Sequence, residues 1–141
     1  MFKQILVALK FGAASEYALA KGAELAKAHG ADLHVLHVMD YEFQDAEQDD
    51  PRLLAYRQDI QRQYQEKIGP VVAGLERVHF DCRPADPAME VCRTAKQIPA
   101  DLIVMGCHQL MEKMCLGRID YVGMTILEKA PCPVMLVPYC D

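Results

Sequence analysis

The sequence predicts a doubly wound α/β fold in which one open, five-stranded parallel sheet carries helices on both faces. Two observations lead to this prediction. Short apolar runs without alternation recur along the chain, which is typical of parallel strands buried on both faces. Segments with apolar residues at three- and four-residue spacing separate these runs. A length of 141 residues is typical of one domain, so we expect a single domain over residues 1–141.

The start of the chain predicts one βαβ unit with a right-handed crossover. Residues 5–9 form the first apolar run, and residues 33–38 form the second. Between them, residues 15–29 have the spacing of an amphipathic helix, with Ser15 as the expected N-cap and Gly30 as the C-terminal stop. This unit places two neighbouring parallel strands at the start of the chain.

Residues 40–51 predict an exposed acidic loop, because they contain six acidic side chains and no apolar periodicity. A second helix is expected over residues 52–75, where apolar residues recur every three or four positions among many charges. Pro70 is expected to kink or split this helix, because proline has no backbone N–H to donate to the preceding turn.

The second half of the chain predicts three more strands and two more helices. The strands are expected over residues 78–82, 102–106 and 134–138, and the helices over residues 88–97 and about 120–130. Asp86 is the expected N-cap of the first of these helices, with Pro87 at its first position. In such a sheet, ligands bind at the carboxyl ends of the strands, near the point where the strand order reverses.

Composition excludes several classes of function. The net charge of −5 and the pI near 5.5 disfavour a nucleic-acid surface, which needs a basic stripe. The apolar run at the N-terminus is too short for a secretory or membrane segment. We therefore expect a cytoplasmic protein with neither a nucleic-acid nor a membrane partner. Six irregularly spaced cysteines without a Cys-x-x-Cys pair predict free thiols and no metal centre.

Two pairs of residues that include histidine do not predict a catalytic or metal site. His108 follows Cys107 directly, and adjacent residues of an extended segment point in opposite directions, which disfavours a Cys/His nucleophile. His34 and His37 lie three residues apart on a predicted strand and so face opposite sides, which disfavours a shared metal ion. We expect local partners for both histidines, and no catalytic residue in the chain.

Four stretches in order along the chain resemble the universal stress protein family: residues 5–9, 36–38, 100–106 and 130–138. The last of these combines a small residue, proline and an apolar strand. Together the four stretches span the whole chain. The resemblance implies the adenine-nucleotide alpha-hydrolase-like fold and a stress-response protein that works through its abundance and its protein partners rather than through catalysis.

The resemblance also implies a test for nucleotide binding. Family members that bind ATP have an Asp at the end of the first strand. After the fourth strand they have Gly-x-x-Gly, nine residues, and Gly-Ser or Gly-Thr, which let backbone N–H groups approach phosphates. Here Lys10 stands at the Asp position, Gln109 at the second Gly, and Ile119 with Asp120 at the final pair. Only Gly106 is retained. The segment that starts at Gly106 resembles the A type of the family, which lacks the motif, so we expect no ATP cofactor.

An ATP-binding switch or slow ATPase stays open as the alternative. Gly117 and Arg118, together with Lys10, offer a glycine and two cations that would rebuild a phosphate cradle. If an adenine nucleotide or another anion binds, we expect it in a pocket at the strand ends formed by Ala8, Lys10, Val38, Met105, Gly106, Gln109, Gly117 and Arg118. A third alternative is a thiol-based redox sensor that uses Cys115 or Cys140.

The last strand predicts a dimer interface. Residues 134–137 are apolar and carry no charge that would protect an exposed sheet edge. The resemblance implies homodimers paired through this strand, and a two-fold axis buries the same patch on both copies. We therefore expect a homodimer whose interface is formed by Val134, Met135, Leu136 and Val137, together with protein partners that the sequence does not identify.

Overall fold

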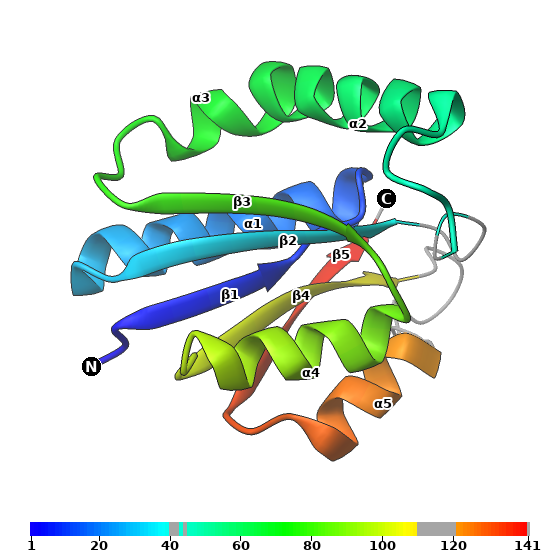
Figure 1. Ribbon diagram of the computed structural model, residues 1–141. Helices are drawn as coiled ribbons and strands as arrows, with labels where there is room; N and C mark the ends of the chain where they lie inside the picture. The colour runs from blue at the N-terminus through cyan, green and yellow to red at the C-terminus, as the bar shows by residue number, and fades with distance from the viewer. Residues whose placement is uncertain (40–42, 44, 110–120, 141) are drawn as a thin grey trace.

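The structure is a computed structural model that describes residues 1–39, 43, 45–109 and 121–140. Five parallel strands form one sheet in the order β3-β2-β1-β4-β5, with helices on both faces (Figure 1). This arrangement confirms the predicted doubly wound α/β fold. The strands are β1 (Gln4–Ala8), β2 (Asp32–Met39), β3 (Val78–Pro84), β4 (Leu102–Gln109) and β5 (Val134–Cys140).

The helices cover the sheet in two layers (Figure 1). One layer contains α1 (Ala13–His29), α2 (Pro51–Gln63), the π-helical turn Tyr64–Ile68 and α3 (Gly69–Val72). The other layer contains α4 (Pro87–Gln97) and α5 (Tyr121–Lys129). Of the helices in the described ranges, none combines the length and the apolar character needed to cross a bilayer.

Each face of the sheet has its own hydrophobic core, because successive side chains of a strand point to opposite faces. Ile5 and Val7 of β1 pack in the cluster that contains the buried side of α1. Leu6, which lies between them, packs in the cluster that contains α4 and Ile126 of α5. This burial on both faces explains why the strands appear in the sequence as continuous apolar runs.

The predicted ends of α1 are confirmed at one end and wrong at the other. Gly30 caps the C-terminus in a left-handed conformation with φ of 65°, as expected for glycine. Ser15 is not the N-cap, because the helix begins at Ala13 after Gly12. The Ser15 hydroxyl instead accepts a hydrogen bond of 2.8 Å from the backbone N–H of Lys10. Ser15 therefore fixes the turn between β1 and α1 from inside the helix.

The long helix predicted over residues 52–75 is interrupted. α2 ends at Gln63, and a π-helical turn follows in which the backbone N–H of Gly69 donates to the carbonyl of Tyr64. Pro70 then lies in the first turn of α3, where its missing N–H leaves no bond unmade. The predicted break at Pro70 is thus confirmed, although the change in helix geometry begins six residues earlier, at Tyr64.

The predicted start of α4 agrees with the structure, whereas three of the predicted strands end too early. The Asp86 carboxylate accepts from the N–H of Met89 at 3.1 Å, with Pro87 at the first helical position. β3, β4 and β5 extend two or three residues beyond their predicted ends. The pairing of β2 with β3 continues as far as Pro84, and that of β4 with β5 as far as Gln109 and Cys140. Apolar runs mark only the buried part of a strand, so they miss these polar extensions.

Asp101 connects the starts of β1 and β4. Its carboxylate accepts hydrogen bonds from the backbone N–H groups of Lys3, at 2.7 Å, and Gln4, at 3.1 Å. Its own N–H donates to the Gln4 carbonyl at 2.9 Å. Two charge-assisted bonds from one carboxylate hold together segments that lie far apart in the sequence.

We predict that Asp101→Ala lowers the free energy of unfolding by about 1–3 kcal/mol, because it removes two hydrogen bonds to a charged acceptor. Urea denaturation followed by circular dichroism measures this change. Asp101→Asn is the matched control, since it keeps one acceptor and should lose less. If the alanine variant is as stable as the wild type, the proposed role of Asp101 is wrong.

Candidate functional site

A cavity of about 380 Å³ lies at the carboxyl ends of β1, β2 and β4. The strand order reverses between β2 and β4 on either side of β1, which is where open α/β sheets bind ligands. Residues from α2, α4 and α5 complete the wall. The volume lies within the range of small-molecule sites, and we treat this cavity as the candidate functional site.

Five of the predicted pocket residues are brought together here. Ala8, Lys10, Val38, Met105 and Gly106 all line the cavity. The other three predicted residues are not placed by the structure. Gln109 is the last residue of β4, and its side chain is not described. Gly117 and Arg118 lie outside the described residues.

Most of the cavity wall is apolar. Leu36, Met105 and Ile126 are buried beneath it, and Val38, Val91 and Val122 complete the apolar part of the lining. Such a wall suits the flat, weakly polar ring of a small molecule. The described polar side chains of the lining are few, and their hydrogen bonds decide what the site can do chemically.

His37 and Ser15 are buried polar residues of the cavity lining, and the two ring nitrogens of His37 have different partners. Nδ1 lies 2.8 Å from the carbonyl oxygen of Leu9, which only accepts, so Nδ1 carries the proton. In the neutral ring, Nε2 then accepts the hydroxyl proton of Tyr56 across 2.9 Å. The ring thus links the end of β1, β2 and α2.

The pairing of His37 with Tyr56 is the part of the site that sequence reasoning missed. The partners expected for His37 exist, but Leu9 and Tyr56 lie 28 and 19 residues away in the sequence and are not local. Its ring lies on the opposite face of β2 from that of His34, as predicted. Tyr56 appeared only as one of several apolar positions of a helix. No local signal places that helix over the carboxyl end of β2, because its position depends on tertiary packing.

Gly106 is required for close packing. A Cβ atom at this position would lie 2.6 Å from the carbonyl oxygen of Ala14 and 2.7 Å from its carbonyl carbon. Both contacts are with backbone, which cannot move aside as a side chain can. The start of α1 can therefore approach β4 only because residue 106 is glycine. This packing accounts for the retained glycine without a phosphate group.

Lys10 lies where the chain leaves β1, and it lines both the cavity and a shallow hollow at the start of α1. A lysine side chain donates hydrogen bonds but accepts none. It cannot replace a carboxylate as the acceptor for the hydroxyl or amino groups of a nucleoside. Lys10 therefore offers a nucleoside no acceptor, and its ammonium group places a cation on the lining of the cavity.

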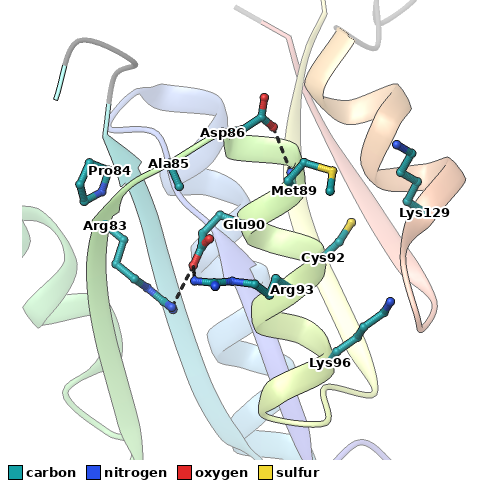
Figure 2. A pocket seen from close by; sticks show the side chains of 10 residues that line it. All are labelled: Arg83, Pro84, Ala85, Asp86, Met89, Glu90, Cys92, Arg93, Lys96 and Lys129. Carbon is teal, nitrogen blue, oxygen red and sulfur yellow. Dashed lines mark hydrogen bonds and ion pairs between the residues drawn. The ribbon is translucent and has the colours of Figure 1, made fainter. Parts of the chain in front are cut away.

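A larger hollow of about 730 Å³ lies between the end of β3 and the helices α4 and α5. Figure 2 shows the Glu90 carboxylate between the guanidinium groups of Arg83 and Arg93, each 2.9 Å from Oε1. The Glu90 side chain is only 7% exposed, so its charge needs these partners. Arg83 also donates to the Thr94 hydroxyl at 3.1 Å. The bonds from Arg83 to Glu90 and Thr94 join β3 to α4.

Three described cysteines, Cys82, Cys92 and Cys132, are free thiols, as predicted. Burial raises the pKa of Cys82 to about 11 and also raises the pKa values of Cys92 and Cys132. These three thiols are therefore protonated at neutral pH, and a protonated thiol is a poor nucleophile. Cys115 and the side chain of Cys140, the two candidates for redox sensing, lie outside the described residues.

Comparison with known proteins connects this geometry to one family. A sequence model of the Universal stress protein family matches residues 1–138. The chain is 29% identical to the universal stress protein Sll1654 of Synechocystis sp. over 98% of this chain and 87% of that protein.

Solved structures of the same family have the same fold. A universal stress family protein from Burkholderia pseudomallei is 28% identical, covers 97% of this chain and 96% of its own, and superimposes with a TM-score of 0.72. A universal stress protein from Archaeoglobus fulgidus in complex with dAMP is 17% identical, covers 95% of this chain and 96% of its own, and has a TM-score of 0.67.

We predict that Glu90→Ala lowers the free energy of unfolding by about 1–3 kcal/mol, because it removes a buried acceptor that two arginines share. Arg93→Ala is the matched control. Its side chain is 62% exposed, and exposed ion pairs contribute at most about 1 kcal/mol. Thermal and urea unfolding of both variants measure the difference. Equal losses in the two variants would contradict this role for Glu90.

Proposed function

The chain belongs to the universal stress protein family, and we propose that it is a cytoplasmic, non-catalytic homodimer that does not use ATP and acts through protein partners. The observation that carries this proposal is Lys10. This lysine stands at the mouth of the candidate site, where ATP-binding members of the family have a carboxylate. Without that carboxylate, the site has no acceptor at this position for the nucleotide, and no described side chain of the cavity takes its place.

The hydrogen bonds of the cavity support the same proposal. Both ring nitrogens of His37 are engaged within the protein, and the Ser15 hydroxyl accepts from the backbone N–H of Lys10. A nucleophile needs an adjacent base to activate it. In the described lining, the histidine is held by Leu9 and Tyr56 instead. This arrangement favours a binding or scaffold role over catalysis.

Binding of an adenine nucleotide, as a switch or with slow ATP hydrolysis, is the second candidate function. The apolar cavity at the switch point of the sheet favours it, as does the relative from Archaeoglobus fulgidus whose structure contains dAMP. A ligand with one phosphate needs no glycine-rich triphosphate loop. If this site binds a nucleotide, we therefore expect a monophosphate, with Lys10 near its charge.

The homodimer proposal rests on β5, which is an edge strand. Pro138 lies within β5, and proline inside a sheet is confined largely to edges. Beside this strand, an open apolar groove of about 590 Å³ runs between α1 and β5, lined in part by Tyr17, Leu25, Met135 and Leu136. Tyr17 is 41% exposed. A second copy paired along β5 would cover both the free strand edge and this groove.

We predict that isothermal titration with Mg·ATP up to about 1 mM gives no binding heat, because the acceptor and the glycine loop are absent. The variant Lys10→Asp introduces the carboxylate and should gain affinity for adenosine, which carries no phosphate charge. Lys3→Asp is the control, since it makes the same charge change at an exposed lysine at the opposite end of β1. Saturable ATP binding by the wild type would favour the second candidate function instead.

We predict that the wild-type protein sediments as a dimer at micromolar concentration and that Met135→Glu weakens the dimer at least about tenfold, because a charge on the apolar edge opposes pairing. Met89→Glu is the matched control on α4, where Met89 is already 55% exposed. Analytical ultracentrifugation over a range of concentrations measures both. A monomeric wild type would contradict the proposed dimer.

A further inference from the structure

Three side chains that can bind a metal converge at the amino-terminal ends of β2 and β3, at the opposite end of the sheet from the cavity. Asp32 and His34 lie two residues apart on β2, so they share one face of the sheet. His79 lies on β3 directly beside His34 in the strand register. One ligand atom from each of the three residues lies within 4.8 Å of the other two.

The spacing is close to that of a coordination site. Nε2 of His79 lies 3.7 Å from Oδ2 of Asp32. In a tetrahedral zinc site with bonds of about 2.0–2.1 Å, neighbouring ligand atoms are about 3.3 Å apart. The rings of His34 and His79 are stacked, with centroids 4.6 Å apart and planes inclined by 19°. Small side-chain rotations would therefore bring the three ligand atoms around one ion.

Neighbouring residues already orient two of the ligands. Arg77 binds Oδ1 of Asp32 and the carbonyl of Gly30, which leaves Oδ2 directed toward His79. Nε2 of His34 lies 2.7 Å from the amide oxygen of Gln4. Because that oxygen accepts, the proton sits on Nε2 and the Nδ1 atom of His34 keeps its lone pair. Partners of this kind are typical of metal-binding histidine and carboxylate groups.

The site is also open to an ion. The His79 side chain is 57% exposed and the Asp32 side chain 21% exposed. β3 is an edge strand, so an ion can enter from the side of the sheet without disturbing the core. The guanidinium group of Arg77 offsets the charge of Asp32, which disfavours the hard cations Mg²⁺ and Ca²⁺. Two imidazole groups favour Zn²⁺ and its neighbours among the transition metals.

We propose that Asp32, His34 and His79 form a binding site for a zinc-type transition-metal ion that joins the edge strand β3 to β2. The sequence predicted no metal centre, because the strand pairing that brings His79 beside His34 is not visible in residue spacing. The ion would link two strands and would stabilise the folded state in proportion to its occupancy. This site is independent of the cavity at the other end of the sheet.

The test is titration of the EDTA-dialysed wild-type protein with ZnCl₂ and, separately, with MgCl₂. We expect one zinc ion per chain, a melting temperature that rises with zinc concentration, and no response to magnesium. His79→Ala, at an exposed position, should weaken zinc binding at least about tenfold. His29→Ala is the control, because it removes a histidine and leaves the three ligands in place.

Two further measurements separate this site from binding by thiols and from loss of folding. In proton NMR, zinc should shift the ring signals of His34 and His79 and leave those of His29 unchanged. Asp32→Asn, which keeps the size of the side chain, should also weaken zinc binding. The proposal is overturned if the wild type binds no zinc. It is equally overturned if His79→Ala and Asp32→Asn bind zinc as tightly as the wild type while cysteine alkylation abolishes binding.

Discussion

The burial of β1 on both faces is the constraint from which the rest of the structure follows. Ile5, Leu6 and Val7 are fully buried, and β1 pairs with β2 on one side and with β4 on the other. Because β2 follows β1 directly whereas β4 comes from the second half of the chain, the strand order reverses beside β1. This reversal opens the cavity where the chain leaves the sheet. The position of the candidate site is therefore a consequence of how β1 is covered.

The chemistry of the cavity follows from contacts within the protein. Gly106 is small because the Ala14 carbonyl approaches it closely, and the ring nitrogens of His37 are hydrogen-bonded to Leu9 and Tyr56. Lys10 then supplies a cation at the mouth of a mainly apolar space. A family known by its fold thus has, in this chain, a site whose polar groups serve structure. That arrangement is why we propose a role through partners rather than through catalysis.

The sequence predicted the features that depend on residues a few positions apart. It missed the contacts that depend on how strands pair and helices pack. The apolar runs of the strands, the Asp86 cap and the Gly30 stop act over a few residues, and the structure contains all of them. Ser15 was misassigned because a hydroxyl near a helix start can bond elsewhere, here to Lys10. The contacts of His37 with Tyr56 and of His34 with His79 join different elements. Residue spacing alone cannot predict them, because they require the strand pairing and the position of α2.

Native mass spectrometry of the freshly purified protein, followed by the same measurement under denaturing conditions, tests the central claim most directly. It reports the number of chains and any bound small molecule together. We expect a mass of two chains with no nucleotide, and no added mass after incubation with magnesium and ATP. A mass increase equal to one adenine nucleotide per chain, retained after purification, would contradict the claim that this family member does not use ATP.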